Sequence, residues 1–150
     1  MSLDINLYDT SVTRTGTGVF IRDKGATREL TTLEEVRKYF PDSDLTGIEE
    51  RVYETNEVFD ANITHNLGRM AEAAGIYTAL WCPDEIEGDT ARKLIEPLAS
   101  GYANLLADPD KFKEFNPENG WGNYEQLVEC VKDYLVACLR YPNAIIKIDK

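Results

Sequence analysis

The chain has 150 residues, of which 43% are hydrophobic and 29% are charged, and these values are typical of one soluble globular domain. Its 27 acidic residues outnumber 16 lysines and arginines, which gives a formal net charge of −11. This charge repels phosphate backbones and anionic lipids, and no apolar run approaches the roughly 20 residues that cross a bilayer, so we expect neither nucleic-acid binding nor membrane association.

The cysteines indicate a reducing compartment. Cys82, Cys130 and Cys138 are odd in number and form no Cys-X-X-Cys motif, which is typical of reduced thiols. No charged and apolar leader precedes a cleavage site at the N-terminus. We therefore expect a cytoplasmic protein without a structural disulfide.

The first 59 residues are predicted to form two strands of one small sheet, with an insertion between them. Residues 3–8 alternate between apolar and polar side chains, and residues 51–59 are rich in valine, tyrosine, threonine and phenylalanine. We interpret 11–50 as the insertion, which holds a Thr/Gly-rich connection, a hairpin over 19–30 and a short helix. That helix begins at the capping box that starts with Thr32.

Segment 61–74 is predicted to be the central helix. Ile63, Leu67 and Met70 recur at three- and four-residue steps, which places them on one helix face. Gly75 suits the left-handed residue that ends a helix. We expect this helix to be the most buried one.

Three more helices and a last strand are predicted to follow. Apolar spacing predicts helices over 90–107 and 124–140, and the Asp-Pro pair at 108–109 opens a brief helix between them. Residues 144–149 predict the final strand. The expected fold is α+β, with a small mixed or antiparallel sheet and about four helices packed on it, of which 61–74, 90–107 and 124–140 lie on one side.

Two stretches are candidates for a ligand site, and the first surrounds the only histidine. His65 is predicted in the first turn of the 61–74 helix, close to Asn62, Asn66 and Arg69. The amides at a helix start together with these side chains suit a polar or anionic ligand. The alternative is that His65 simply bonds the backbone at the helix start.

The second stretch is the loop 116–122, in which glycines stand on both sides of Trp121. Space around the indole would let it lie flat on a base or sugar ring, with Asn119 and Tyr124 beside it. Equally, Trp121 could fill the core where the next helix starts. If the two stretches meet, they combine an aromatic wall with a few fixed polar groups, as small-molecule pockets do.

Three functions are compatible with these features. The first hypothesis is binding of a polar or anionic, nucleotide-like small molecule between the two stretches. The second is an acidic inhibitor from a phage or mobile element, which imitates nucleic acid and docks on a basic protein. The third is an enzyme that uses His65 as acid or base, although no nucleophile motif accompanies it. One histidine without ligand spacing predicts no metal site, and we expect no cofactor.

Two motifs resemble those of a family of small bacterial and phage proteins whose function is not known. They are NITHNLG at 62–68 and NPENGWG at 116–122. The resemblance covers 57–150 and the first strand, so 11–50 would be an insertion relative to the family. It implies a consistent α+β fold and a cytosolic or phage setting, but no mechanism.

Overall fold

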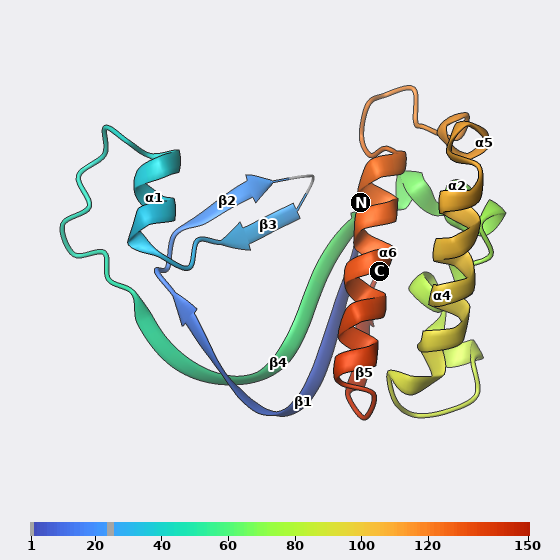
Figure 1. Cartoon of the computed structure of the whole chain (residues 1–150), viewed down its shortest axis with the longest axis horizontal. Coiled ribbons are helices and arrows are strands. Elements are labelled where there is room, and N and C mark those ends of the chain that lie inside the picture. The colour runs from blue at the N-terminus through green and yellow to red at the C-terminus, as the bar shows by residue number, and fades with distance from the viewer. Residues whose placement is uncertain (1, 24–25) are drawn as a thin grey trace.

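The computed structural model describes residues 2–23 and 26–150 and has an α+β fold (Figure 1). A three-stranded antiparallel sheet has the order β4-β1-β5, and β2 and β3 form a separate hairpin. The strands are β1 (Ser2–Gly16), β2 (Phe20–Asp23), β3 (Ala26–Glu29), β4 (Arg51–Thr64) and β5 (Ile145–Asp149). The α-helices are α1 (Leu33–Tyr39), α2 (Gly68–Ala73), α3 (Tyr77–Trp81), α4 (Arg92–Ala107), α5 (Pro109–Lys113) and α6 (Tyr124–Arg140).

β1 and β4 pair as a long, curved ribbon that connects two parts of the molecule (Figure 1). The register shifts between Leu7 and Tyr8 and again between Tyr8 and Val12, so the two strands bulge where the ribbon leaves the helices. Extra residues in a strand bend it and increase its twist. α1 lies far from α4 and α6, and the β2–β3 hairpin lies between α1 and α6 (Figure 1). We call residues 9–56 the arm and the remaining described residues the body.

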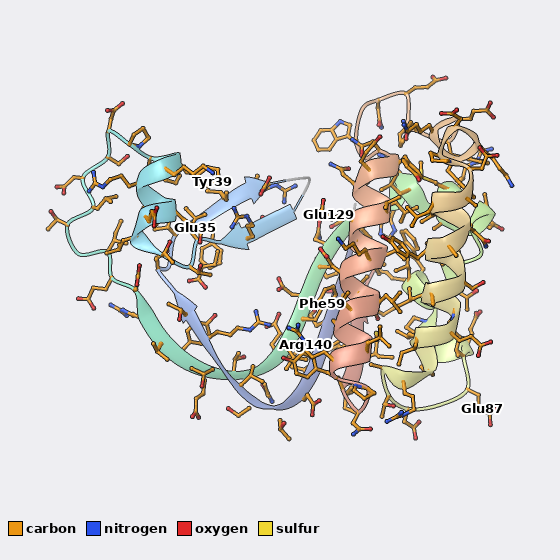
Figure 2. All side chains as sticks on the ribbon, in the orientation of Figure 1. Glu35, Tyr39, Phe59, Glu87, Glu129 and Arg140 are labelled. Carbon is orange, nitrogen blue, oxygen red and sulfur yellow. The ribbon has the colours of Figure 1, made fainter. Side chains whose placement is uncertain are left out.

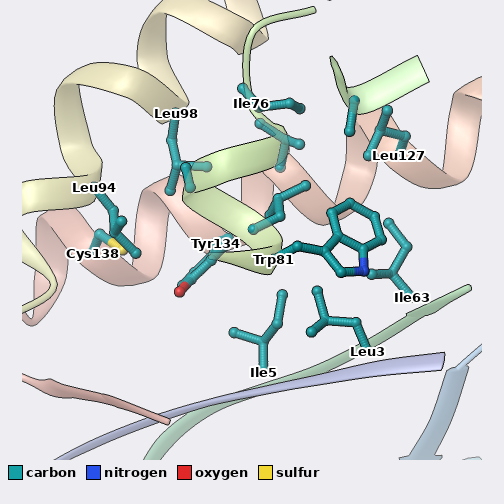
Figure 3. Close-up of a cluster of buried hydrophobic side chains, with 14 of the residues drawn as sticks. Leu3, Ile5, Ile63, Ile76, Trp81, Leu94, Leu98, Leu127, Tyr134 and Cys138 are labelled. Atoms are coloured by element: carbon teal, nitrogen blue, oxygen red, sulfur yellow. The ribbon is translucent and has the colours of Figure 1, made fainter. Parts of the chain in front are cut away.

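The core of the body lies between one face of the sheet and the helices (Figure 3). Leu3, Ile5 and Leu7 alternate along β1 and are fully buried, as the period of two predicts. Trp81 from α3 and Tyr134 from α6 are the largest side chains packed above them. The other fully buried leucines of the body are Leu67, Leu80, Leu94, Leu98, Leu105 and Leu127. In the described part of the chain, no helix is long and apolar enough to span a membrane.

The strands and helix starts agree with most sequence predictions. β5 pairs with β1, so both terminal strands share the predicted sheet. The side chains of Thr32, Asp108 and Asn123 accept hydrogen bonds from backbone amides three residues ahead, as N-caps do. The hairpin is present in β2 and β3, although its connection at 24–25 lies outside the described residues.

The predicted helix over 61–74 is wrong in its first half. Residues 61–64 end β4, residues 65–67 form a single 3-10 turn, and only α2 is α-helical. Ile63 is buried in a strand as it would be in a helix, so the apolar pattern alone did not separate the two. Pairing with β1 satisfies the backbone of this segment instead. Similarly, 11–16 continues β1 and is not a loop.

Candidate functional site

The two stretches singled out in the sequence meet in space. The Nδ2 atom of Asn66 donates a hydrogen bond to the carbonyl oxygen of Trp121, 3.3 Å away. Gly122 packs against Thr64 and Leu67, and a Cβ atom there would lie 2.6 Å from the Thr64 Cγ2 atom. Gly122 also has a φ of 101°, which favours glycine. The 116–122 loop is therefore fixed against the junction of β4 and α2.

The loop holds the backbone of Trp121 and leaves its side chain outside. The Oδ1 atom of Asn119 accepts from the Trp121 amide at 3.0 Å, and Gly120 between them has a φ of 76°. The Oδ1 atom of Asn116 accepts from the amide of Tyr124 at 2.8 Å, which closes the loop onto α6. The Trp121 side chain is nevertheless 69% exposed. A loop whose backbone is held by these hydrogen bonds thus presents an indole ring to solvent.

A groove of about 960 Å³ runs beside this ring. It lies between the 116–122 loop, the start of α6, the end of β4 and the hairpin of the arm. The uncharged side chains that offer hydrogen bonds are the amides of Asn62, Asn66, Asn119 and Gln126 and the hydroxyls of Ser2 and Thr64. Trp121 and Phe59 supply aromatic surface. The groove therefore combines a flat apolar ring with directional polar groups, as ligand sites do.

The charges of the groove are mostly negative. Its charged members are Asp23, Asp60, Glu129, Asp133, Arg22 and Arg28. Glu129 projects from α6 toward the hairpin (Figure 2). The guanidinium of Arg28 donates to Asp23 at 3.0 Å and to Glu35 at 3.2 Å, and these bonds raise its pKa above the ordinary value. Arg22 donates to the Thr27 hydroxyl at 3.1 Å. Both arginines are thus engaged within the protein.

His65 has a structural partner instead of a place in the groove. Its Nδ1 atom accepts a hydrogen bond from the indole nitrogen of Trp81 at 2.8 Å. Trp81 is 2% exposed and stacks on Tyr77 with ring centroids 5.1 Å apart. In Figure 3 its indole nitrogen points away from Tyr134. The acceptor atom Nδ1 of His65 is therefore occupied by the Trp81 indole N–H.

Two further predicted site residues also lie outside the groove lining. Arg69 is exposed on α2, so its charge does not join the Asn62 and Asn66 side chains there. Tyr124 is only 7% exposed, and its hydroxyl donates to the carbonyl oxygen of Leu105 at 2.6 Å. Burial raises the pKa of that hydroxyl. Tyr124 therefore ties α6 to α4 and does not form a second stacking surface behind Trp121.

Sequence reasoning missed the wall that α6 contributes. Gln126, Glu129 and Asp133 line the groove at three- and four-residue steps, which places them on one helix face. The polar stripe on this amphipathic helix was the available signal. Arg22 and Arg28 had no such signal, because the bend in the ribbon brings the hairpin near α6.

The remaining wall of the groove offers little reactivity. Cys130 is half-buried there, and burial together with the charges of Asp133 and Glu129 raises the pKa of its thiol to about 12. A protonated thiol is a poor nucleophile. Within residues 2–23 and 26–150, no group of three or more His, Cys, Asp and Glu side chains is arranged to hold a metal ion.

Comparison with known proteins found no matching family model, no matching curated protein and no matching solved structure. The resemblance drawn from the two motifs therefore stays an expectation.

Proposed function

We propose that the chain binds a polar, nucleotide-like small molecule in the groove beside Trp121. The main support for this proposal is that the Trp121 side chain is 69% exposed on a loop whose backbone is held by hydrogen bonds with Asn66 and Asn119. A large ring that folding leaves in water gains free energy when another flat surface covers it. Because the loop is already ordered, stacking there carries a small entropic cost.

The neighbouring amides support a ligand with a hydrogen-bonding edge. Asn62, Asn66, Asn119 and Gln126 each carry a carbonyl oxygen and an amide nitrogen, so they recognise planar polar groups. Their position beside Trp121 suits a ring that stacks on the indole and reaches the amides with its edge. The three free thiols favour a cytosolic setting for this activity.

Docking on a basic protein is the second candidate. The observation that favours it is the excess of carboxylates on the groove, together with the net charge of −11. Such recognition weakens steeply with salt.

An enzyme that depends on His65 has less support, because the His65 Nδ1 atom accepts the hydrogen bond from the Trp81 indole and the His65 side chain does not line the groove.

The test uses the two tryptophans, which differ in exposure. Native mass spectrometry of the purified protein first identifies any retained ligand. Acrylamide quenching of fluorescence in a Trp81→Phe variant then reports Trp121 alone, with and without nucleosides, nucleotides and sugars. We expect a ligand of the groove to protect Trp121 from acrylamide.

The matched control is Val52→Ala, which shortens an exposed apolar side chain of the arm that does not line the groove. Trp121→Ala should abolish binding, and Val52→Ala should leave it unchanged. If no compound is retained or protects Trp121, the pocket is wrong. A pull-down on basic proteins at low salt then becomes the next experiment.

A further inference from the structure

We infer that two copies of the chain pair through β5 and form a symmetric dimer, which joins their three-stranded sheets into one. β5 is the last strand of its sheet, and in the described part of the chain it pairs only with β1. No other described segment forms hydrogen bonds with the backbone of residues 145–149. The outer N–H and C=O groups of β5 therefore form a template for a further strand. This edge does not line the groove, so the inference does not depend on the proposed function.

The apolar side of β5 is incompletely covered. Ile148 lies opposite Ile5 of β1, which is fully buried. Ile146 lies opposite Leu7, which is also fully buried. Ile146 and Ile148 are themselves only half-buried, since β5 is the edge strand. A strand added at this edge would cover apolar surface that the folding of one chain leaves in water.

The polar side of β5 carries two charges that no described residue pairs. Lys147 and Asp149 are exposed, and neither takes part in a hydrogen bond or ion pair with the described residues. In the register of β1 and β5, Asp149 lies opposite Asp4, so two negative side chains are neighbours. Lys147 lies opposite the uncharged Asn6. A positive side chain on the outer side of Asp149 would therefore be favourable.

One antiparallel register supplies that charge. If the twofold axis passes between the two Ile148 residues, each Lys147 lies opposite the Asp149 of the second copy, and symmetry makes two such pairs. A register centred on Lys147 sets two lysines against each other. A register centred on Ile146 leaves both charges unpaired. The sequence of β5 thus favours the first register, which closes as a twofold dimer.

The other edge of the sheet suits pairing less well. β4 follows the curve of the ribbon, and its register with β1 shifts twice (Figure 1). Bulged and twisted strands are poor templates for a further strand. β5 has only five residues, so the interface is small and we expect a weak dimer. At physiological salt, charges more than about 8 Å apart are largely screened, so the net charge of −11 does not prevent this pairing.

Exchange of the two charges tests both the edge and the register. Lys147→Asp places two negative side chains opposite each other, and Asp149→Lys places two positive ones. In sedimentation equilibrium at physiological salt, the natural chain should form a dimer at concentrations up to about 1 mM, and either single variant should weaken it about tenfold or more. The double variant Lys147→Asp, Asp149→Lys restores opposite charges and should restore the dimer. A mixture of the two single variants should also pair, because each supplies the charge that the other lacks.

The matched control is Lys38→Asp on α1, which makes the same change of net charge as Lys147→Asp far from β5 (Figure 1). It should leave the association unchanged, and circular dichroism checks that every variant is folded. A natural chain that stays monomeric up to about 1 mM overturns the inference. A dimer that survives both single variants also overturns it, because another surface then joins the copies. So does a mixture of the single variants that stays monomeric.

Discussion

Replacing His65 by alanine should destabilise the fold and spare the groove. The change removes the acceptor of the Trp81 indole N–H, and Trp81 is 2% exposed. A buried donor left without its partner costs about 1–3 kcal/mol. In a domain of this size, 1 kcal/mol corresponds to about 2–4 °C, so we expect the Tm to fall by about 2–12 °C. Thermal and urea unfolding followed by circular dichroism measure it.

A double-mutant cycle isolates the hydrogen bond from the lost packing of the imidazole. In a Trp81→Phe background the donor is gone, so His65→Ala should cost about 1 kcal/mol less than in the natural chain. His65→Asn should recover part of the loss, since its Oδ1 atom offers an acceptor near the former Nδ1 position. Arg69→Ala, an exposed change on α2, is the control and should stay within about 0.5 kcal/mol.

Two results would refute this account. If His65→Ala costs the same with and without the Trp81 indole, the hydrogen bond contributes nothing measurable. If a folded His65→Ala protein loses ligand binding while Trp121 stays exposed to acrylamide, His65 acts in the site and not through Trp81. Both outcomes can be measured with the natural chain, the two single variants His65→Ala and Trp81→Phe, and their combination.

Tyr134→Phe should leave stability unchanged or raise it by about 1 kcal/mol, because the Tyr134 hydroxyl is buried with no hydrogen-bond partner among the described residues. Tyr124→Phe, which loses a bond to Leu105, should lower it, and a urea midpoint that falls for Tyr134→Phe contradicts the reasoning. Burial raises the pKa of the Cys130 and Cys138 thiols from 9.0 to about 12, so the unfolded chain ionises first and stability should fall as pH rises from about 9 to 12. Urea titrations at pH 8 and 10.5 should show a smaller loss in a Cys130→Ala, Cys138→Ala variant, and an equal loss would exclude the thiols as its cause.

Much of the fold could be predicted because its signals are local. The alternation of Leu3, Ile5 and Leu7 identifies a strand with one buried face, and all three are fully buried. Caps such as Thr32 and Asn123 act within one helical turn, so their sequence patterns suffice. The extra length of β1 had no such signal. Threonines and a glycine at 13–16 are typical of loops, and only their pairing with β4 makes them a strand.

The encounter of Asn66 with Trp121 depends on long-range packing. The glycines around Trp121 indicated an open loop, and the loop does expose the indole. What joins the loop to the end of β4 is the close approach of Gly122 to Thr64 and Leu67. This close packing depends on the shapes of both segments, so it cannot be predicted from either stretch of sequence alone. The candidate residues could therefore be chosen from the sequence, but the contact between Asn66 and Trp121 could not be predicted from it.

The predicted pocket loses the positive charge of Arg69 because residues 61–64 end strand β4 and do not begin a helix. In a helix over 61–74, residues 62, 66 and 69 share one face, which would put Arg69 beside both asparagines. In a strand the period is two, so Asn62 lies beside Asp4 on the polar face of the sheet and opposite buried Ile63. The turn at 65–67 then rotates His65 toward Trp81 and leaves Arg69 on the outer surface of α2. One change of backbone period thus removes Arg69 from the predicted pocket, and the two arginines that do line the groove, Arg22 and Arg28, come from the hairpin of the arm.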